Sequence, residues 1–386
     1  MLLTYKFKLK PTKSQTIELN QWLGTCRFVY NLCLGYKKDV YNCYQKSISK
    51  NEMQKELTFI RKDYDWIGNV HSQTIQDVTD RLDKAYKSFF KGGGFPHFAK
   101  RGMYSSFNFK QKIKICENTN KIKFPSLGKI SFRKSREIPS QIKFAIVKKE
   151  YDGWYVCLVC ETPNKINEIP NKNILGIDLG IKDYIITSQG NKFENPKYLR
   201  KYEKDLKLCQ RNLSRKKKGS ENRKKNIYLL QKTHAKIRNI RKDFLHKLSS
   251  EIINENQVIV LENLQIKNML KNHKLAKSIS DASWGIFSEM LKYKSEFQNK
   301  ELIFISPNYT SMDCSECGWR NKDLELKDRE WVCTDCGVIH DRDINAAKNI
   351  KQKGIEKIKK EAGHVFSTCG DIMVGSTQPA QESHVF

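Results

Sequence analysis

Cys314-Ser-Glu-Cys317 and Cys333-Thr-Asp-Cys336 come shortly before the run His340-Asp-Arg-Asp-Ile-Asn-Ala-Ala-Lys-Asn-Ile350. Two C-x2-C pairs separated by 15 residues have the spacing of a four-cysteine zinc site. A glycine, Gly318 or Gly337, directly follows each pair and allows the tight turn that such a knuckle needs. Four thiolates leave Zn²⁺ no open position, so the metal would be structural. We therefore predict one structural zinc ion, with Cys314, Cys317, Cys333 and Cys336 as its ligands.

Three acidic residues lie where a predicted element begins or ends. Asp178 interrupts an apolar strand, Glu262 directly follows another apolar strand, and Asp343 opens a predicted helix. A carboxylate within a buried strand is costly unless it is paired or binds a metal. Three such groups could hold two Mg²⁺ ions, which in phosphodiester cleavage activate the attacking water and stabilise the leaving oxygen.

Each of these carboxylates also has a simpler explanation. Asp178 could be a cap or turn residue, Glu262 an exposed strand-end charge, and Asp343 the N-cap of its own helix. Asp183 and Asp341 are close neighbours, and Asp343 is preferred to Asp341 because it directly precedes the helix start. Taken together, with the order of strands, hairpin and helices around them, the three carboxylates favour an RNase H-like nuclease site.

The chain is strongly basic. Its 386 residues, enough for two or three domains, include 71 Lys and Arg against 42 Asp and Glu, a formal net charge of +29. Such an excess favours a polyanionic partner, and nucleic acid is the usual one. Between Arg200 and Lys247, 18 Lys or Arg stand against 4 acidic residues in two predicted helices. A solvated helical hairpin is the alternative explanation. We predict nucleic-acid contacts at Arg215, Lys216, Lys217 and Lys218.

The sequence offers no membrane or secretion signal. No stretch approaches the ~20 apolar residues of a membrane span, and the N-terminus alternates like a strand where a signal peptide would have an apolar core. We therefore expect an intracellular protein. In that reducing compartment the 12 cysteines are not expected to form disulfides.

The first half predicts strands interrupted by helices. A strand at 2–10 is followed by helical periodicity within the segment 13–104, and short strand-like runs with Gly and Pro turns occupy about 107–161. A β-barrel formed by residues 1–12 and 105–165, with a helical lobe inserted at 13–104, fits this order.

The second half alternates strands and helices. A polar segment from Pro163 to Asn173 predicts the boundary between the halves. Beyond it we predict an α/β domain made of residues 172–310 and 338–361, which encloses the zinc segment 311–337. The polar tail 363–386 is predicted to be disordered.

Several motifs resemble those of the TnpB family, RuvC-type proteins that insertion sequences encode and that are related to type V CRISPR effectors. In the second half they are Gly176-Ile-Asp-Leu-Gly180, Leu261-Glu-Asn-Leu264, Pro307-Asn-Tyr-Thr-Ser311 and Asp343-Ile-Asn-Ala-Ala347. In the first half they are Tyr5-Lys-Phe-Lys-Leu-Lys-Pro-Thr12, Cys26-Arg-Phe-Val-Tyr-Asn31, Arg81-Leu-Asp-Lys-Ala-Tyr86 and Gly94-Phe-Pro-His-Phe98. The number, order and spacing of these motifs carry the resemblance, which covers nearly the whole chain.

The resemblance implies an α+β multidomain fold. It consists of an N-terminal wedge-like β-barrel with a helical recognition insertion, then an RNase H-like (RuvC) domain with an inserted four-cysteine zinc ribbon. The resemblance also implies that Asp178, Glu262 and Asp343 are a catalytic triad that binds two Mg²⁺ ions. The implied activity is RNA-guided, two-metal cleavage of DNA beside a short flanking motif.

The implied partners are a guide RNA from the end of the mobile element and a double-stranded DNA target, and a monomer is expected. The resemblance assigns the reading of the flanking motif to the helix at 72–91. Gln76 is the candidate there, because a glutamine can bond bidentately to an adenine edge. A polar residue on a helix surface is the alternative explanation for Gln76.

Two other functions stay open on the sequence alone. One is a non-cleaving, nucleic-acid-binding regulator of transposition in which the acidic residues are structural. The other is a DNA transposase, whose three-carboxylate site would look similar but would join strands as well as cut them. The zinc segment directly before the last carboxylate makes the transposase the weaker alternative.

Overall fold

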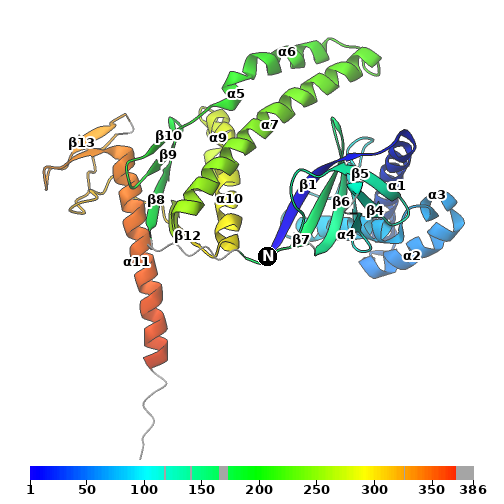
Figure 1. Cartoon of the computed structure of the whole chain (residues 1–386), viewed down its shortest axis with the longest axis horizontal. Coiled ribbons are helices and arrows are strands. Elements are labelled where there is room, and N and C mark those ends of the chain that lie inside the picture. The colour runs from blue at the N-terminus through cyan, green and yellow to red at the C-terminus, as the bar shows by residue number, and fades with distance from the viewer. Residues whose placement is uncertain (117–118, 140, 165–172, 326, 371–386) are drawn as a thin grey trace, which may run out of the picture. The chain divides into compact units, whose positions relative to one another are not determined.

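The computed structural model describes residues 1–116, 119–139, 141–164, 173–325 and 327–370 (Figure 1). The chain divides into two compact units, Met1–Pro163 and Asn164–Phe386. The architecture is α+β, with sheets and helices in both units. Within the described ranges, no helix is both long enough and apolar enough to cross a membrane.

The first unit contains a seven-stranded antiparallel sheet with the order β2-β6-β7-β1-β5-β4-β3. Its first strand alternates as predicted, with Phe7 and Leu9 buried at 2% and 3% exposure between more exposed lysines. The strands are β1 (Leu2–Lys10), β2 (Ser106–Phe109), β3 (Lys114–Cys116), β4 (Lys121–Phe124), β5 (Gly128–Arg133), β6 (Ile142–Glu150) and β7 (Gly153–Glu161).

Four helices stand between β1 and β2 in the chain: α1 (Lys13–Tyr44), α2 (Lys50–Asp63), α3 (Asp65–Gly68) and α4 (Ser72–Phe90). A capping box starts α1, because the Thr12 hydroxyl accepts a hydrogen bond from the Gln15 backbone and the Gln15 side chain accepts one from the Thr12 backbone. The Trp22 ring of α1 packs on Phe107 and Phe109 of β2, with ring centroids 5.6 and 5.8 Å apart. The helices and the sheet therefore share one core.

The sheet of the first unit is strongly curled. Phe109 of β2, at one end of the strand order, contacts Phe124 of β4, next to the other end, with ring centroids 5.1 Å apart. Among the described strands, no pairing joins β2 to β3. The strand pairs therefore define a curled sheet, and its closure into a barrel stays a prediction.

The second unit contains a five-stranded mixed sheet with the order β10-β9-β8-β11-β12. The strands β8, β11 and β12 run parallel, and β9 and β10 continue the sheet antiparallel from β8. The strands are β8 (Ile174–Leu179), β9 (Asp183–Thr187), β10 (Lys192–Glu194), β11 (Val258–Glu262) and β12 (Glu301–Ile305).

Successive side chains of β11 point to opposite faces of this sheet, and helices pack on both faces. Ile259 and Leu261 belong to an apolar cluster with residues of α7 (Glu221–Glu255) and α10 (Trp284–Phe297). Val258 and Val260 belong to a second cluster, which includes Ile350 of α11 (Arg342–Gly370). Figure 1 shows α11 on one side of β8, with α7 and α10 on the other. A strand that is buried on both faces typically has a continuous apolar sequence, as Val258 to Leu261 of β11 do.

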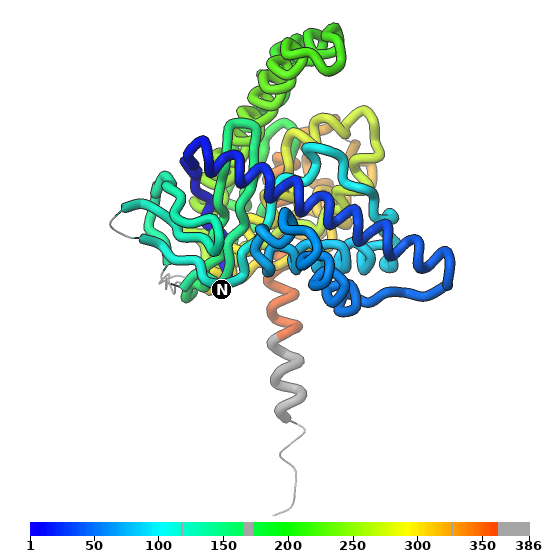
Figure 2. The backbone as a smooth tube through the Cα atoms, turned by 90° about the vertical axis from the view of Figure 1, so that its right-hand side faces the viewer, coloured from blue at the N-terminus to red at the C-terminus, as the bar shows by residue number. Residues whose placement is uncertain are grey.

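The basic segment of the second unit forms a helical hairpin of α6 (Glu203–Ser214) and α7, preceded by the short α5 (Tyr198–Lys201). The two basic helices predicted between Arg200 and Lys247 are therefore present, with the first divided at Tyr202. Figure 2 shows the tip of this hairpin standing clear of the rest of its unit. Two further short helices, α8 (Ile266–Met269) and α9 (Ala276–Ala282), follow β11.

The final helix is longer than predicted. Whereas the sequence pattern placed its end near residue 361, α11 continues to Gly370. A single glycine inside a helix costs only about 1 kcal/mol, so Gly363 need not end it. The disorder predicted for 363–386 stays a prediction. Residues 371–386 lie outside the described ranges.

Candidate active site

The backbone brings Asp178 and Glu262 to the same edge of the sheet. In the parallel pair β8 and β11, Ile177 lies opposite Leu261, and Asp178 and Glu262 are the next residues of the two strands. Leu175 and Ile177 pack toward α7 and α10, as Ile259 and Leu261 do. Because successive side chains alternate between faces, Asp178 and Glu262 both project toward α11.

Two glycines let α11 pack closely against the sheet. A Cβ atom at Gly176 of β8 would lie 2.2 Å from the Ala347 carbonyl oxygen and 2.6 Å from the Lys351 backbone nitrogen. At Gly354 of α11, a Cβ atom would lie 2.4 Å from a methyl carbon of Val260. The helix backbone therefore crosses β8 and β11 at a distance that only glycine allows, and this crossing brings Asp343, in the first turn of α11, to the strand ends.

Asp178, Glu262 and Asp343 line one cavity of about 510 Å³. Asp183, at the start of β9, lines the same cavity. The residues that the sequence pattern singled out as a catalytic set are thus together in space, although they lie far apart in the chain.

The surroundings of Asp178 and Glu262 disfavour the charged form of both carboxyl groups. Burial and then the neighbouring carboxylates of Glu262 and Asp343 raise the pKa of Asp178 to about 7. Burial also raises the pKa of Glu262, against the opposing effect of a hydrogen bond from Thr310. The Arg329 guanidinium lies 3.5 Å from the Asp343 carboxylate, at the edge of the cavity.

This donor set suits a hard cation. Crowded carboxylates with raised pKa values gain most from a bound divalent ion, and oxygen ligands are the ones that Mg²⁺ prefers. In the part of the chain that the structure describes, only the four cysteines bring three or more candidate ligand atoms within 4.8 Å of one another. The carboxylates are more widely spaced, so water and substrate oxygens would have to complete the coordination of Mg²⁺ between them.

Asp341 has a different task from Asp343. One Asp341 carboxylate oxygen accepts hydrogen bonds from the backbone nitrogens of Asp343 and Ile344, at 3.0 Å each. The other oxygen lies 2.5 Å from the Lys192 ammonium, and these contacts together lower the pKa of Asp341. Asp341 is therefore the residue that caps α11, and the alternative explanation of Asp343 as an N-cap is wrong. Capping by Asp341 leaves the Asp343 side chain available to the cavity.

A network of buried polar side chains connects Glu262 to the loop before the cysteines. The Thr310 hydroxyl donates to a Glu262 carboxylate oxygen at 2.5 Å. The Asn349 side-chain amide of α11 donates to the backbone carbonyls of Thr310 and Asp313, at 2.8 and 2.6 Å. Asn345, one helical turn earlier, donates to the Asp313 carbonyl and accepts from the Ser315 backbone nitrogen.

Thr310, Asn345 and Asn349 lie within the motifs quoted above, but the sequence alone predicted no role for them. The signal that could have identified the two asparagines is their i, i+4 spacing on the buried, otherwise apolar face of the helix, where unpaired amides are costly. Asn345 is 1% exposed and Asn349 is 8% exposed. Thr310 had no comparable signal, because loops place polar residues without a period.

The four cysteines form one compact cluster. Cys314 Sγ lies 3.7 Å from Cys336 Sγ, and Cys317 Sγ lies 3.6 Å from Cys333 Sγ. The two pairs come from similar knuckles. In each, the glycine after the second cysteine has a positive φ (81° at Gly318 and 74° at Gly337), and its backbone nitrogen donates to the carbonyl of the first cysteine at 2.9 Å.

The cysteine cluster is supported from β14 (Ile339–Asp341), which pairs with β13 (Glu330–Val332). His340 is buried, its ring stacks on Trp331 with centroids 4.7 Å apart, and its Nε2 lies 3.0 Å from Cys314 Sγ. Four sulfur donors in this arrangement suit a single tetrahedral metal ion, and zinc is the usual one.

The predicted nucleic-acid contacts lie elsewhere. Arg215 to Lys218 are exposed at the turn between α6 and α7. Gln76 belongs to the other unit, where it is exposed on α4 and borders a cavity of about 290 Å³. The structure leaves all five side chains accessible, and the four residues at the hairpin turn do not line the carboxylate cavity of their own unit.

Three family models match the chain. A model for OrfB of IS605, described as a "Probable transposase", covers residues 157–273. A model described as "Cas12f1-like, TNB domain" covers 284–350, and one described as a "Helix-turn-helix domain" covers 1–46. The last of these segments folds here as the strand β1 followed by the long helix α1.

Two relatives align over nearly their full length. A protein of Streptomyces pristinaespiralis named "Putative RNA-guided DNA endonuclease" is 34% identical over 98% of this chain and 92% of its own length. InsQ of Escherichia coli (strain K12), which bears the same description, is 31% identical over 99% of this chain and 97% of its own length. The chain belongs to the TnpB family.

The fold of this TnpB-family chain is also similar to a solved structure. The match is to a chain in the cryo-EM structure of a Cas12f1–sgRNA–target DNA complex, with a TM-score of 0.56 and 15% identity. It covers 88% of this chain and 83% of the other.

Proposed function

We propose that this protein is an RNA-guided DNA endonuclease of a mobile element, cutting DNA by two-metal, RuvC-type phosphodiester hydrolysis. The observation that carries the proposal is the convergence of Asp178, Glu262 and Asp343 on one cavity, at the ends of β8 and β11 and the start of α11. The names of the two full-length relatives support RNA guidance and DNA as the substrate.

The domain organisation that we propose follows the strand orders. An RNase H-like domain is supported by the three parallel strands β8, β11 and β12, which two antiparallel strands continue. Carboxylates lie at the ends of β8 and of its parallel neighbour β11. The contact between Phe109 and Phe124 supports closure of the N-terminal sheet into a wedge-like barrel, with α1–α4 as the recognition insertion. The cysteine knuckles support a zinc ribbon at 311–337.

In the proposed reaction, Asp178, Glu262 and Asp343 would hold the catalytic ions. Two bound Mg²⁺ ions would supply activation of the attacking water and stabilisation of the leaving oxygen. Thr310 donates to Glu262 and so keeps one carboxylate oxygen in a fixed orientation. Arg329 provides a positive charge at the mouth of the cavity, where it can attract the phosphate to be cut.

Guide pairing would supply sequence specificity, so the protein mainly needs charge to hold a heteroduplex and a displaced strand. We propose Arg215, Lys216, Lys217 and Lys218 at the hairpin tip as such contacts. Gln76 is the proposed reader of the flanking motif, since it is exposed on α4. Zn²⁺ on the four cysteines would have a structural role.

The test begins with the RNA that copurifies when the protein is expressed with its native downstream DNA. A discrete RNA that ends in sequence from beyond the element supports the proposal and identifies the target for a cleavage assay. A mixture of unrelated cellular fragments contradicts guidance and favours a generic nucleic-acid binder. Strand joining to the element's ends would instead identify a transposase.

Thr310→Val is expected to slow single-turnover cleavage about tenfold, with target binding unchanged. The substitution removes the hydroxyl that donates to Glu262, and a hydrogen bond to a charged group contributes about 1.5–3 kcal/mol. Thr310→Ser, which keeps the hydroxyl, should cleave within about threefold of the wild type. Equal rates for the valine and serine variants would show that this hydrogen bond is unimportant to the reaction.

The Mg²⁺ concentration for half-maximal cleavage is expected to rise as the pH falls below about 7. Burial and the neighbouring carboxylates raise the pKa of Asp178 to about 7, so below that pH a bound ion must displace a proton. This half-maximal Mg²⁺ concentration should increase by nearly tenfold for each pH unit below about 7, and it should become constant above about pH 8. Titrations of Mg²⁺ at pH 6, 7 and 8 measure it. A half-saturating concentration independent of pH would contradict the assignment of Asp178 as a ligand.

A further inference from the structure

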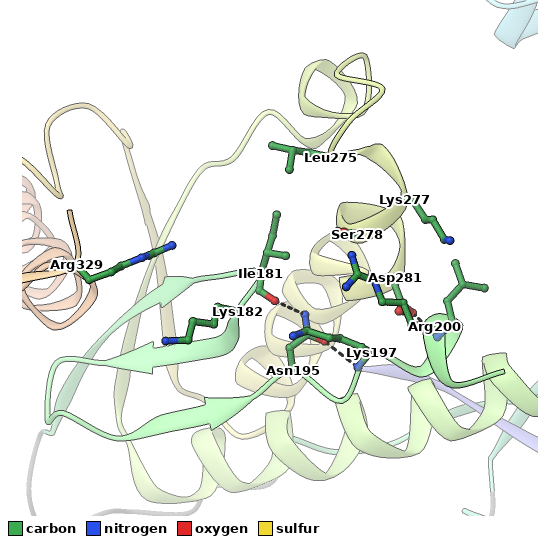
Figure 3. Close-up of a pocket in the computed structure, with 11 residues that line it drawn as sticks. Ile181, Lys182, Asn195, Lys197, Arg200, Leu275, Lys277, Ser278, Asp281 and Arg329 are labelled. Atoms are coloured by element: carbon green, nitrogen blue, oxygen red, sulfur yellow. Dashed lines mark hydrogen bonds between the residues drawn. The ribbon is translucent and has the colours of Figure 1, made fainter. Parts of the chain in front are cut away.

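A second cavity, of about 390 Å³, adjoins the carboxylate cavity (Figure 3). Ile181, Lys182, Leu275 and Arg329 line both, so the two spaces share a wall. We call the second one the basic cavity, because its lining includes Lys182, Lys197, Arg200, Lys277 and Arg329. Its volume lies within the range of about 300–1,000 Å³ that ligand sites occupy.

The single acidic residue of the basic cavity is already neutralised. Asp281 is 9% exposed, and one of its oxygens accepts a hydrogen bond from the Arg241 guanidinium at 2.7 Å. Both oxygens also accept from the backbone nitrogen of Leu199, at 3.1 and 3.0 Å. Asp281 therefore fixes the start of α5 against α9 and leaves little negative charge for the surrounding cations.

Three of the five cations remain available to a ligand. Lys277 pairs with Glu203 at 2.7 Å, and Arg329 lies 3.5 Å from Asp343. For Lys182, Lys197 and Arg200, all exposed, the described part of the chain offers no side-chain hydrogen bond or ion pair. Unpaired cations around a concave space raise the local concentration of anions.

The backbone at Lys197 is held in an unfavourable conformation. Its φ of 47° and ψ of 48° are left-handed, which costs a non-glycine residue roughly 1–2 kcal/mol. Asn195 maintains the turn: its side-chain oxygen accepts from the Lys197 backbone nitrogen at 3.2 Å, and its amide donates to the Ile181 carbonyl at 2.9 Å, as Figure 3 shows. The turn thereby ties the Lys197 loop to the loop that carries Lys182.

We propose that the basic cavity binds the sugar–phosphate backbone of the DNA strand being cut, at a phosphate next to the scissile one. Lys182, Lys197 and Arg200 contact the phosphate oxygens, and the apolar side chains of Ile181 and Leu275 cover the sugar. The inference rests on the proposed function for the identity of the substrate. It adds a substrate-binding site that the carboxylates and the hairpin tip do not provide.

The first test measures binding alone. A triple variant, Lys182→Gln, Lys197→Gln and Arg200→Gln, is compared with a matched triple, Lys292→Gln, Lys359→Gln and Lys360→Gln, which removes the same charge from exposed positions outside the cavity. Both are made in an Asp178→Ala background, so that no DNA is cut. The probe is a fluorescent single-stranded DNA hexanucleotide, followed by anisotropy over a salt series.

The cavity triple is expected to weaken binding about tenfold or more, and the matched triple less than twofold. The slope of log K against log salt should become less steep by about 0.7 for the cavity triple, because it loses one phosphate contact and each such contact on a single strand contributes about 0.7. A hexanucleotide with uncharged methylphosphonate linkages should bind both triples equally. Equal binding of the charged probe by both triples, or a difference that persists with the uncharged probe, would overturn the proposal.

The second test measures single-turnover cleavage with the same two triples, now with Asp178 restored. The cavity triple should cleave at least tenfold more slowly at an unchanged half-saturating Mg²⁺ concentration, and cleavage at the matched triple's rate overturns the proposal. A wild-type protein that cuts no DNA with any guide, yet binds the hexanucleotide through the cavity cations, overturns the proposed function and supports the cavity assignment. The two failures are thus distinguishable.

Discussion

Asp178→Asn is expected to abolish DNA cleavage and, at the same time, to raise the melting temperature of the Mg²⁺-free protein at pH 8. Loss of one ligand should lower the cleavage rate by at least a thousandfold, since carboxylates that hold catalytic ions act as a unit. The stability gain follows from the raised pKa of Asp178. Between its unfolded value, 3.8, and about 7, the folded state holds a proton that the unfolded chain has lost.

The direction of this effect is opposite to that of an ordinary ion-paired aspartate. Stability falls as the pH rises through that window, and at pH 8 the buried charge costs a few kcal/mol. An asparagine of the same shape carries no charge, so the melting temperature should rise by several degrees at pH 8 and by much less at pH 4, where Asp178 is already protonated.

Differential scanning calorimetry without Mg²⁺, at both pH values, measures the stability change, and a guide-dependent cleavage assay measures the activity. Asp183→Asn is the matched control, because it removes the same charge from the lining of the same cavity. Asp183→Asn should cleave DNA at a rate within about tenfold of the wild-type rate. A lower melting temperature for Asp178→Asn at pH 8 would contradict the electrostatic account of the site.

Gly176→Ala is expected to destabilise the protein and to reduce cleavage more than a hundredfold, although it adds only one methyl group. The new Cβ would lie 2.2 Å from a backbone oxygen of α11, and backbone cannot rotate away as a side chain can. Overpacking of this kind typically costs 1–3 kcal/mol. The helix must move outward, and Asp343 moves with it.

The control for this substitution is Gly285→Ala in α10, where the new Cβ would meet one methyl carbon of Ile266 at 3.5 Å, an ordinary contact. Alanine is the better helix former, so Gly285→Ala should leave cleavage intact and raise stability by up to about 1 kcal/mol. Urea unfolding and single-turnover cleavage compare the two. A Gly176→Ala protein that cleaves at the wild-type rate would show that the α11 position is not critical.

The zinc knuckles and the strand-end carboxylates could be predicted from sequence because each depends on local spacing. In the two C-x2-C pairs, the glycine after each pair allows the tight turn that the knuckle needs. An acidic residue that directly follows an apolar strand lies where that strand leaves the sheet. The convergence of Asp178, Glu262 and Asp343 required more, namely the parallel pairing of β8 with β11 and the crossing of α11. Only the family resemblance supplied that.

Roles decided by a difference of one or two residues were harder to predict. Asp341 directly precedes α11 and Asp343 lies in its first turn, and a helix boundary predicted from sequence is uncertain by at least the two residues between them. Thr310 and Arg329 act across loops, whose paths depend on tertiary contacts that leave no periodic pattern. The extension of α11 past Gly363 was missed because a glycine after a polar run usually signals an end.

The segment with the four cysteines is attached to the rest of the protein at both ends by the beginning of one helix. Asn345 and Asn349 hold its first residues, at Asp313 and Ser315, and Asp341, which follows shortly after it, caps the same helix. Its ends are therefore fixed side by side, and the closure of a longer loop between them costs only about 0.6 kcal/mol for each doubling of length. In evolutionary terms this is an insertion point: the segment can be lengthened, shortened or exchanged between relatives while the carboxylates stay in place.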